Sequence, residues 1–308
     1  MLVTGAVLAS AVLHACWNAL AHRAGDALAA VALVMVGLAG VSLPLVFFVA
    51  APAAASWPFL AVSLVLHVTY TVLLARCYSI GDFGQVYPLA RGSAPLVVAL
   101  LAVVLVGERL SWVALAGVGA VCGGLWVLVG GAGQQGAGPQ GAGQQGAGQQ
   151  GAGLRGAGLR GFGLRGRVHN PRAVLVAAAT GLAIAGYTTV DGVGVRRAGS
   201  TLGYTVWLLG ALGVAMLAYA AWQYGRSLVA SMRRMWWLVA VGGTLGWASY
   251  ALVLWAQTRG ALAAVAALRE TSVVVAAVLG TLFFGERFGR RRIVATLLVA
   301  AGIVLLNL

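Results

Sequence analysis

The chain has 308 residues, of which 61% are hydrophobic and only 8% are charged. Because soluble domains carry about 25% charged residues, this composition excludes an ordinary soluble protein. The net charge is +14, and all 20 basic residues are arginine. Most of them lie in short segments between apolar runs, where arginine meets lipid headgroups, so we expect a bilayer and not a nucleic acid as the partner of this charge.

Apolar runs of about 20 residues recur along the chain, and a helix of that length crosses a bilayer. They predict an all-α, multi-pass protein of the cell membrane. Ten transmembrane helices are expected, at 3–21, 28–50, 57–78, 84–106, 111–130, 173–192, 202–224, 235–257, 262–284 and 290–307. The first run lacks a basic segment before it and a cleavage site after it, so we interpret it as a retained span and not a signal peptide.

A low-complexity segment separates the fifth span from the sixth. Residues 131–165 are seven copies of a five-residue unit that changes from Gly-Ala-Gly-Gln-Gln to Gly-Ala-Gly-Leu-Arg. Such a composition cannot bury enough apolar area to order itself. We therefore interpret 131–172 as a flexible linker between a first five-helix repeat, 1–130, and a second, 173–308. A tail whose arginines touch anionic lipid is the alternative.

The two halves carry the same pattern at the same spacing. Arg91 stands sixteen residues before the motif at 107–109, and Arg269 stands sixteen before the motif at 285–287; both motifs read Gly-Glu-Arg. An odd number of spans per repeat requires the second copy to be inverted in the membrane. In proteins built this way, sites lie at the repeat interface near the midplane. The Gly-Glu-Arg motifs fall at span ends, so we interpret them as caps of the turn to the next helix.

The opening span of each half also presents two polar groups four residues apart. These are His14 and Asn18 in the first half, and Tyr187 and Asp191 in the second. Residues four apart lie on one helix face. His14 could relay a proton, or make a structural hydrogen bond; Asn18, Tyr187 and the neighbouring Trp17 could form a cavity wall, although aromatic residues near span ends often lie in the interfacial belt.

Charged residues within a span cost at least about 2.5–3.5 kcal/mol each, so they persist where they pair or line a wet cavity. Arg91 is such a residue, with Tyr87 on the same helix face and prolines at 88 and 95 that should bend the helix. Its guanidinium could hold a carboxylate or phosphate of a substrate. Alternatively, it reaches an interface or forms a buried pair.

Arg269 and Glu270 are adjacent, so their side chains point about 100° apart and should not be each other's main partner. Glu270 replaces Gly92 of the first half, which breaks the symmetry. A desolvated carboxyl group can bind a substrate amine or exchange a proton near neutral pH. A static ion pair of Glu270 with either arginine is the alternative.

Asp191 is the remaining acid within a span. It precedes Arg196 and Arg197 at the end of the sixth predicted span. It could take part in proton coupling, or it could be an interfacial acid that pairs with those two arginines.

These motifs, in this order and spacing, resemble the EamA-type members of the drug/metabolite transporter superfamily. The segments that carry the resemblance are His14–Leu20, Tyr87–Gly92, Gly107–Ser111, Tyr187–Gly192, Leu268–Ser272 and the Gly-Glu-Arg motif at 285–287. The resemblance implies ten helices in two inverted repeats around a central cavity. It further implies secondary transport, often export, of a small polar metabolite such as an amino acid.

The expected function is alternating-access transport of such a small molecule, which could be coupled to protons. An integral-membrane enzyme or a lipid-handling protein is the alternative. The six acids form no catalytic or metal-binding constellation, and the three cysteines lack metal spacing, so we expect no catalytic residue, cofactor or metal. A homodimer is left open. Orientation is also open, because the distribution of arginines favours both termini outside and the family resemblance suggests both inside.

Overall fold

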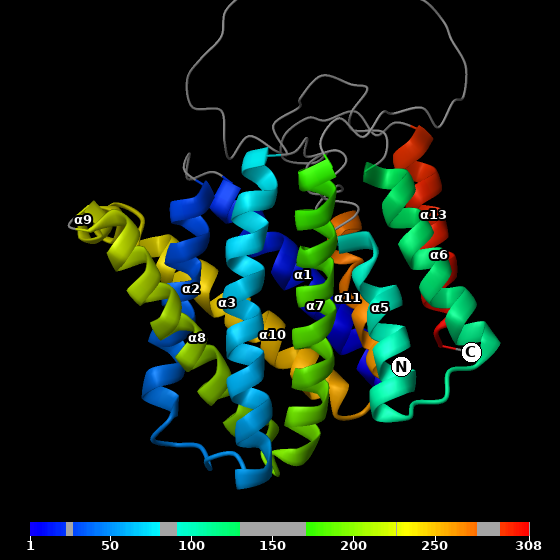
Figure 1. Cartoon of the computed structure of the whole chain (residues 1–308), viewed down its shortest axis with the longest axis horizontal. Helices are drawn as coiled ribbons and strands as arrows, with labels where there is room; N and C mark the ends of the chain where they lie inside the picture. Colours follow the sequence, from blue (N-terminus) through cyan, green and yellow to red (C-terminus); the bar gives the residue numbers. More distant parts are fainter. Residues whose placement is uncertain (23–26, 81–90, 130–170, 226, 276–289, 308) are drawn as a thin grey trace, which may run out of the picture.

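The computed structural model describes residues 1–22, 27–80, 91–129, 171–225, 227–275 and 290–307, and these residues are helical without a strand (Figure 1). The helices are α1 Leu2–His22, α2 Ala27–Leu45, α3 Trp57–Ile80, α5 Ala94–Leu101, α6 Trp112–Val129, α7 Pro171–Arg197, α8 Thr201–Tyr224, α9 Ser227–Arg234, α10 Gly243–Gln257, α11 Leu262–Arg269 and α13 Arg290–Leu305. A short 3-10 turn covers Ala54–Ser56, and π-helical turns cover Ala102–Val106 and Leu238–Gly242.

Several of these helices are long and apolar enough to cross a membrane. Among the described residues, five segments meet that length and composition: Leu2–Ala21, Ala54–Leu74, Val174–Arg197, Thr201–Gln223 and Leu238–Gln257. Shorter apolar helices occupy Ala30–Leu45, Ala94–Val106, Trp112–Val127 and Ile293–Leu305. The described residues therefore form an all-helical membrane protein. The exact count of ten spans stays a prediction, because the fourth and ninth predicted spans extend into 81–90 and 276–289, outside the described residues.

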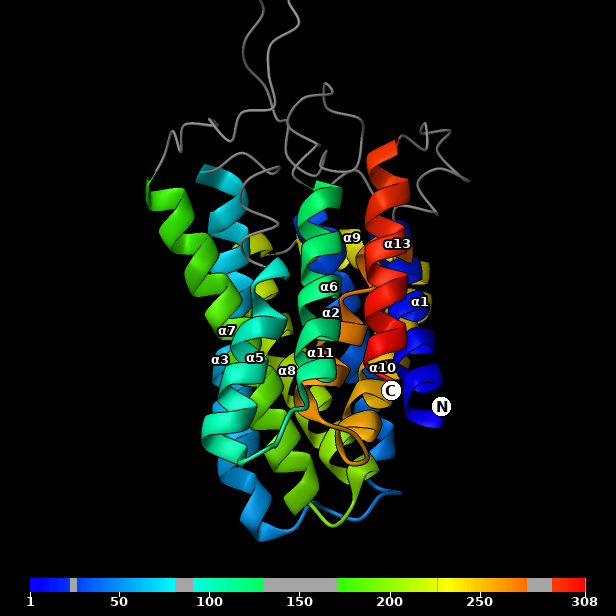
Figure 2. The same ribbon diagram turned by 90° about the vertical axis from the view of Figure 1, so that its right-hand side faces the viewer.

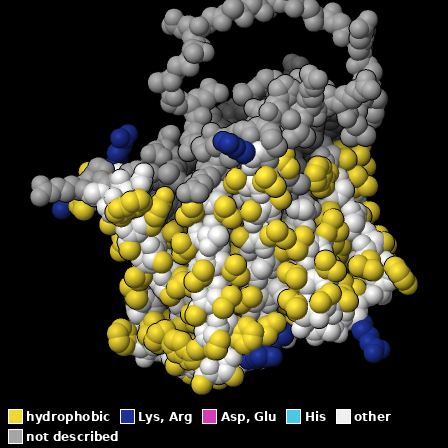
Figure 3. Space-filling view, viewed as in Figure 1, with side chains coloured by type: hydrophobic (Ala, Val, Ile, Leu, Met, Phe, Trp, Pro, Cys, Tyr) yellow, Lys and Arg dark blue, Asp and Glu magenta, His cyan; other side chains and the backbone are white. Residues whose placement is uncertain are grey.

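The outer surface fits a lipid environment. Large apolar side chains such as Leu175, Leu182 and Leu297 are more than half exposed, and apolar groups cover the face shown in Figure 3. Exposed Trp112 and Trp222 lie at helix ends, where tryptophan commonly anchors a protein at the headgroup level. A soluble protein could not display so much apolar surface without aggregating.

The helices pack in pairs, each with one helix from the first half of the chain and one from the second. α3 lies along α7, α1 along α10, α2 along α8, and α6 along α13. α1 and α7 run in opposite directions in Figures 1 and 2, the relation that the predicted inversion requires. Small residues allow the closest approach: a Cβ added to Gly243 would lie 2.5 Å from the Cα of Gly37 on α2. Such contacts between small residues are typical of helix packing in membranes.

Both helices that carry the repeated arginines are interrupted at the arginine. The chain bends at Ser93, and α5 then begins with Pro95 in its first turn, where a missing N–H costs no helical hydrogen bond. In the second half, α11 ends at Arg269, and a turn at 270–271 precedes a further helical stretch at 272–275. The interruption predicted from the prolines is thus present near Arg91. The matching interruption at Arg269 could not be predicted in this way, because no proline lies near it.

Candidate functional site

An ion pair joins the two halves of the chain in the middle of the bundle. The Nε of Arg91, just before α5, lies 3.5 Å from the Oε2 of Glu270, just after α11. Both groups are nearly inaccessible, with 12% and 4% of their side chains exposed. Among the alternatives for Glu270, the structure therefore shows the contact with Arg91. This separation exceeds the roughly 2.7–2.9 Å of a charge-assisted hydrogen bond, so the pair is loosely held.

Arg269 has different partners from its neighbour, as the angle between adjacent helical residues predicts. Its Nη2 donates a hydrogen bond to the Tyr187 hydroxyl at 3.0 Å. Its guanidinium carbon lies 5.7 Å from the ring centre of Tyr187 and 5.5 Å from that of Tyr250. His67 on α3 stacks on the Tyr187 ring, with 3.9 Å between centroids. Aromatic rings thus surround this buried cation and offset part of its desolvation.

Asp191 lies in the core and not at an interface. It is fully buried and accepts hydrogen bonds from the hydroxyls of Tyr204, at 3.0 Å, and Tyr250. Arg196 instead contacts Glu108 and backbone carbonyls, and Arg197 lies over the ring of Phe59, 4.8 Å from its centroid. The interpretation of Asp191 as an interfacial partner of these arginines is therefore wrong, because α7 continues for six residues beyond the acid before it ends. Tyr250 contacts both Asp191 and Arg269, so it links the two buried charged groups.

A small cavity adjoins the ion pair, with room for about one water molecule. Its lining comes from α5, α7, α11 and the turn after α11. The lining residues are Ala94, Pro95, Val98, Ile184, Thr188, Ala266, Arg269 and Glu270. The cavity therefore lies between elements of both halves, with Arg269 and Glu270 as its charged groups.

The predicted site residues of α1, which are His14, Trp17 and Asn18, contact one another. Asn18 donates a hydrogen bond from Nδ2 to the backbone oxygen of His14 at 2.8 Å, so its side chain is bonded within its own helix. Trp17 is buried and packs edge-on against the His14 ring, with 5.1 Å between centroids. Trp17 is thus a core residue and not part of an interfacial belt. Tyr87 lies outside the described residues.

Three residues that the sequence did not suggest complete the centre: His67, Tyr204 and Tyr250. A weak signal existed for His67, since Ser63 precedes it by four residues in an otherwise apolar run, and the Ser63 hydroxyl lies 3.1 Å from Nδ1 of His67. The two tyrosines had no signal, because a lone tyrosine in an apolar helix is common. Only the packing of α8 and α10 against α7 brings their hydroxyls to Asp191.

The first Gly-Glu-Arg motif caps a helix, though not the one expected. Gly107 ends the π-turn with φ of 73°, a left-handed conformation that glycine adopts without strain. The Glu108 carboxylate then accepts the backbone N–H of Leu262, the first residue of α11, at 2.9 and 3.1 Å. The motif therefore contacts the other half of the chain instead of the next helix. The second motif, at 285–287, lies outside the described residues.

The fold and this buried centre define a helical membrane protein with charged groups held between its two halves. Residues 171–308 match the model of the EamA-like transporter family. The match supports an EamA-type transporter of the drug/metabolite transporter superfamily. No curated protein matches the sequence. A crystal structure of another protein, 20% identical, resembles this one with a TM-score of 0.67 over 99% of this chain and 98% of that chain, which shows a shared fold.

Proposed function

We propose that the chain is a secondary transporter, working as an exporter, of a small polar metabolite such as an amino acid or a related compound. The observation that carries this proposal is the Arg91–Glu270 ion pair, which joins the two halves of the chain beside a cavity. Charged groups are expensive inside a membrane, and by default they mark a substrate or ion pathway.

The chemistry of the pair suits a zwitterion. Arg91 offers a planar guanidinium that binds a carboxylate in a forked geometry, and Glu270 offers an acceptor for an ammonium group. Because the two side chains are 3.5 Å apart, each can exchange its present partner for one charged group of a substrate. Arg269 adds a second cation beside the same cavity.

We further propose that two inverted five-helix repeats, 1–130 and 173–308, rock about this centre. The pattern of packing supports this. In such a repeat α1 corresponds to α7, and α3 corresponds to α10. The contact of α3 with α7 then corresponds to the contact of α10 with α1, and both contacts are present. The α2–α8 and α6–α13 contacts each join a helix to its own counterpart. Alternating access in such proteins is a rocking of one repeat against the other around a fixed site.

Proton coupling is proposed for Glu270, Asp191 and His14. Glu270 lies beside both Arg91 and the cavity, and in the proposed cycle a proton or a substrate cation takes the place of Arg91 at its carboxylate. Asp191 is connected to the same centre through Tyr250. The Tyr250 hydroxyl donates a hydrogen bond to Asp191, and the Tyr250 ring lies beside the guanidinium of Arg269. His14 lies on α1, where its ring packs edge-on against Trp17.

Counterflow in liposomes tests the proposal. Purified protein is reconstituted, the vesicles are loaded with unlabelled solute, and entry of labelled amino acids, organic acids and sugar phosphates is measured against protein-free vesicles. We expect accumulation of at least one amino-acid-like solute. Absence of flux for every class, together with turnover of a lipid substrate, would show instead a membrane enzyme or a lipid-handling protein.

A further inference from the structure

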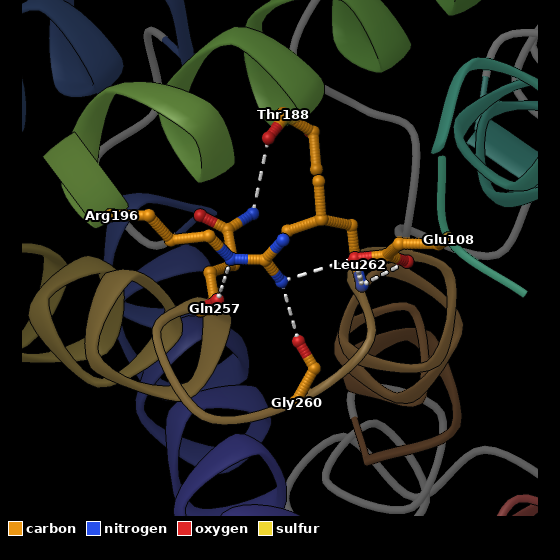
Figure 4. Close-up of polar contacts among 6 residues, drawn as sticks. All are labelled: Glu108, Thr188, Arg196, Gln257, Gly260 and Leu262. Atoms are coloured by element: carbon orange, nitrogen blue, oxygen red, sulfur yellow. Dashed lines mark hydrogen bonds and ion pairs between the residues drawn. The ribbon is translucent and has the colours of Figure 1, made fainter. Parts of the chain in front are cut away.

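A polar network lies at the end of the bundle toward which both chain termini lie (Figures 1 and 4). Its centre is Glu108, from the first half. The Glu108 Oε1 accepts a hydrogen bond from Nη2 of Arg196 on α7 at 3.1 Å, while both carboxylate oxygens accept the N–H of Leu262 on α11. One side chain of the first half is thus bound to two helices of the second half.

Arg196 extends this network into the loop between α10 and α11. Its Nε donates to the carbonyl oxygen of Gln257 at 2.8 Å, and its Nη2 donates to that of Gly260, also at 2.8 Å. The Gln257 side chain in turn donates to the carbonyl oxygen of Thr188, at 3.1 Å, and Thr188 lines the central cavity. The network therefore connects the end of the bundle to the wall of the cavity.

The position of these contacts matters because of what α11 carries. Leu262 begins α11 and Arg269 ends it, so Glu108 holds the N-terminus of the helix that bears the charged groups of the centre. α11 has eight residues and is therefore about 12 Å long. Glu108 thus contacts the end of α11 opposite to Arg269. The Glu108 and Arg196 side chains are 13% and 31% exposed, so water can reach their contact when it opens.

We propose that Glu108 and Arg196 form a lock that holds this end of the substrate pathway shut and that must open in every transport cycle. The proposal rests on the proposed alternating-access function. Rocking of the two halves separates Glu108 from Arg196 and Leu262, because these residues belong to different halves. A contact that bridges the halves at one end, and is only moderately buried, can be broken at a cost that a transport cycle can meet.

Distance measurements between spin labels test the lock. In a background with Cys16, Cys77 and Cys122 replaced by alanine, labels are attached at Arg109→Cys and Arg259→Cys, two exposed positions beside the network. Glu108→Gln keeps an oxygen for the Leu262 N–H but removes the charge that holds Arg196; Arg196→Gln removes the partner. The matched control is Arg197→Gln, the neighbouring arginine, which lies over Phe59 and outside the network.

We expect a longer distance population in Glu108→Gln and in Arg196→Gln. Its ratio to the shorter population should rise about tenfold over the control, the size expected for loss of one charge-assisted hydrogen bond. Distributions identical to the control in both variants, with folding verified by circular dichroism, overturn the lock. The readout needs no substrate. A wild-type protein without counterflow would overturn the proposed function alone, whereas normal counterflow with unchanged distances would overturn the lock alone.

Discussion

Arg91 and Glu270 meet across the boundary between the halves of the chain, although they are not counterparts in the repeated pattern. The counterpart of Arg91 is Arg269, and that of Glu270 is Gly92. The structure gives a reason why an acid stands in only one copy. A Cβ added to Gly92 would lie 3.1 Å from Nε1 of Trp126, so the indole occupies the space that a side chain there would need.

The first prediction concerns the stability of this pair. Arg91→Leu or Glu270→Leu alone leaves a buried charge without its partner, and each should lower the free energy of unfolding by about 3–5 kcal/mol. The double variant removes both charges and should lose much less. Thermal and denaturant unfolding in detergent provides the measurement. Additive losses in the double variant would show that the two groups do not interact.

The second prediction concerns the proton. If Glu270 carries the coupled proton, Glu270→Gln should still exchange substrate between the two sides of a vesicle but should lose acceleration by a pH gradient. Asp191→Asn serves as the comparison, because the other proposed coupling acid is changed in the same way. Normal pH dependence in the Glu270 variant, with loss in the Asp191 variant, would move the coupling role to Asp191.

The third prediction separates the two tyrosines that bind Asp191. Tyr204→Phe and Tyr250→Phe each remove one hydrogen bond to the carboxylate, so each should cost about 1.5–3 kcal/mol of stability. Only Tyr250 also faces Arg269. We therefore expect the transport rate to fall more in Tyr250→Phe than in Tyr204→Phe, at similar stability. Equal rates would show that the link from Asp191 to the centre has no role in transport.

The fourth prediction tests the contact between α2 and α10. Gly243→Ala places a methyl group 2.5 Å from the Cα of Gly37, and this backbone cannot move aside like a flexible side chain. The variant should lose about 1–3 kcal/mol, seen as a lower unfolding temperature in detergent. Gly119→Ala is the control, because a Cβ at that helical glycine meets nothing within 4 Å. Equal stability of the two variants would contradict the packing described.

Much of the architecture could be predicted because the apolar runs are long and the charges between them are few. The run at 202–224 became α8 at Thr201–Tyr224 almost without change. Short features were not predictable: α9, with two arginines in its last turn, fell where a plain loop was expected. An eight-residue helix has too few turns for its period to stand out from the surrounding loop.

The central site could be predicted only in part, for a physical reason. Arg91, Arg269 and Glu270 are conspicuous because a charge in an apolar run is costly. The contact of Arg91 with Glu270, and the tyrosine partners of Asp191, depend on how distant helices are rotated and shifted against each other. Helical periodicity fixes which residues of one helix share a face, but it does not fix which faces of two helices meet. The interfacial interpretation of Asp191 failed for another reason, because the sixth span was predicted to end at 192 whereas α7 continues to Arg197.

The most direct test of the central claim is substrate counterflow by the double variant Arg91→Leu/Glu270→Leu, measured beside the wild type in the same liposomes. Because this variant removes both charges of the pair, we expect it to fold and to keep the size and helical content of the wild type. We predict that it transports no amino-acid-like solute that the wild type carries. Counterflow at the wild-type rate would contradict the assignment of this ion pair to the transport site.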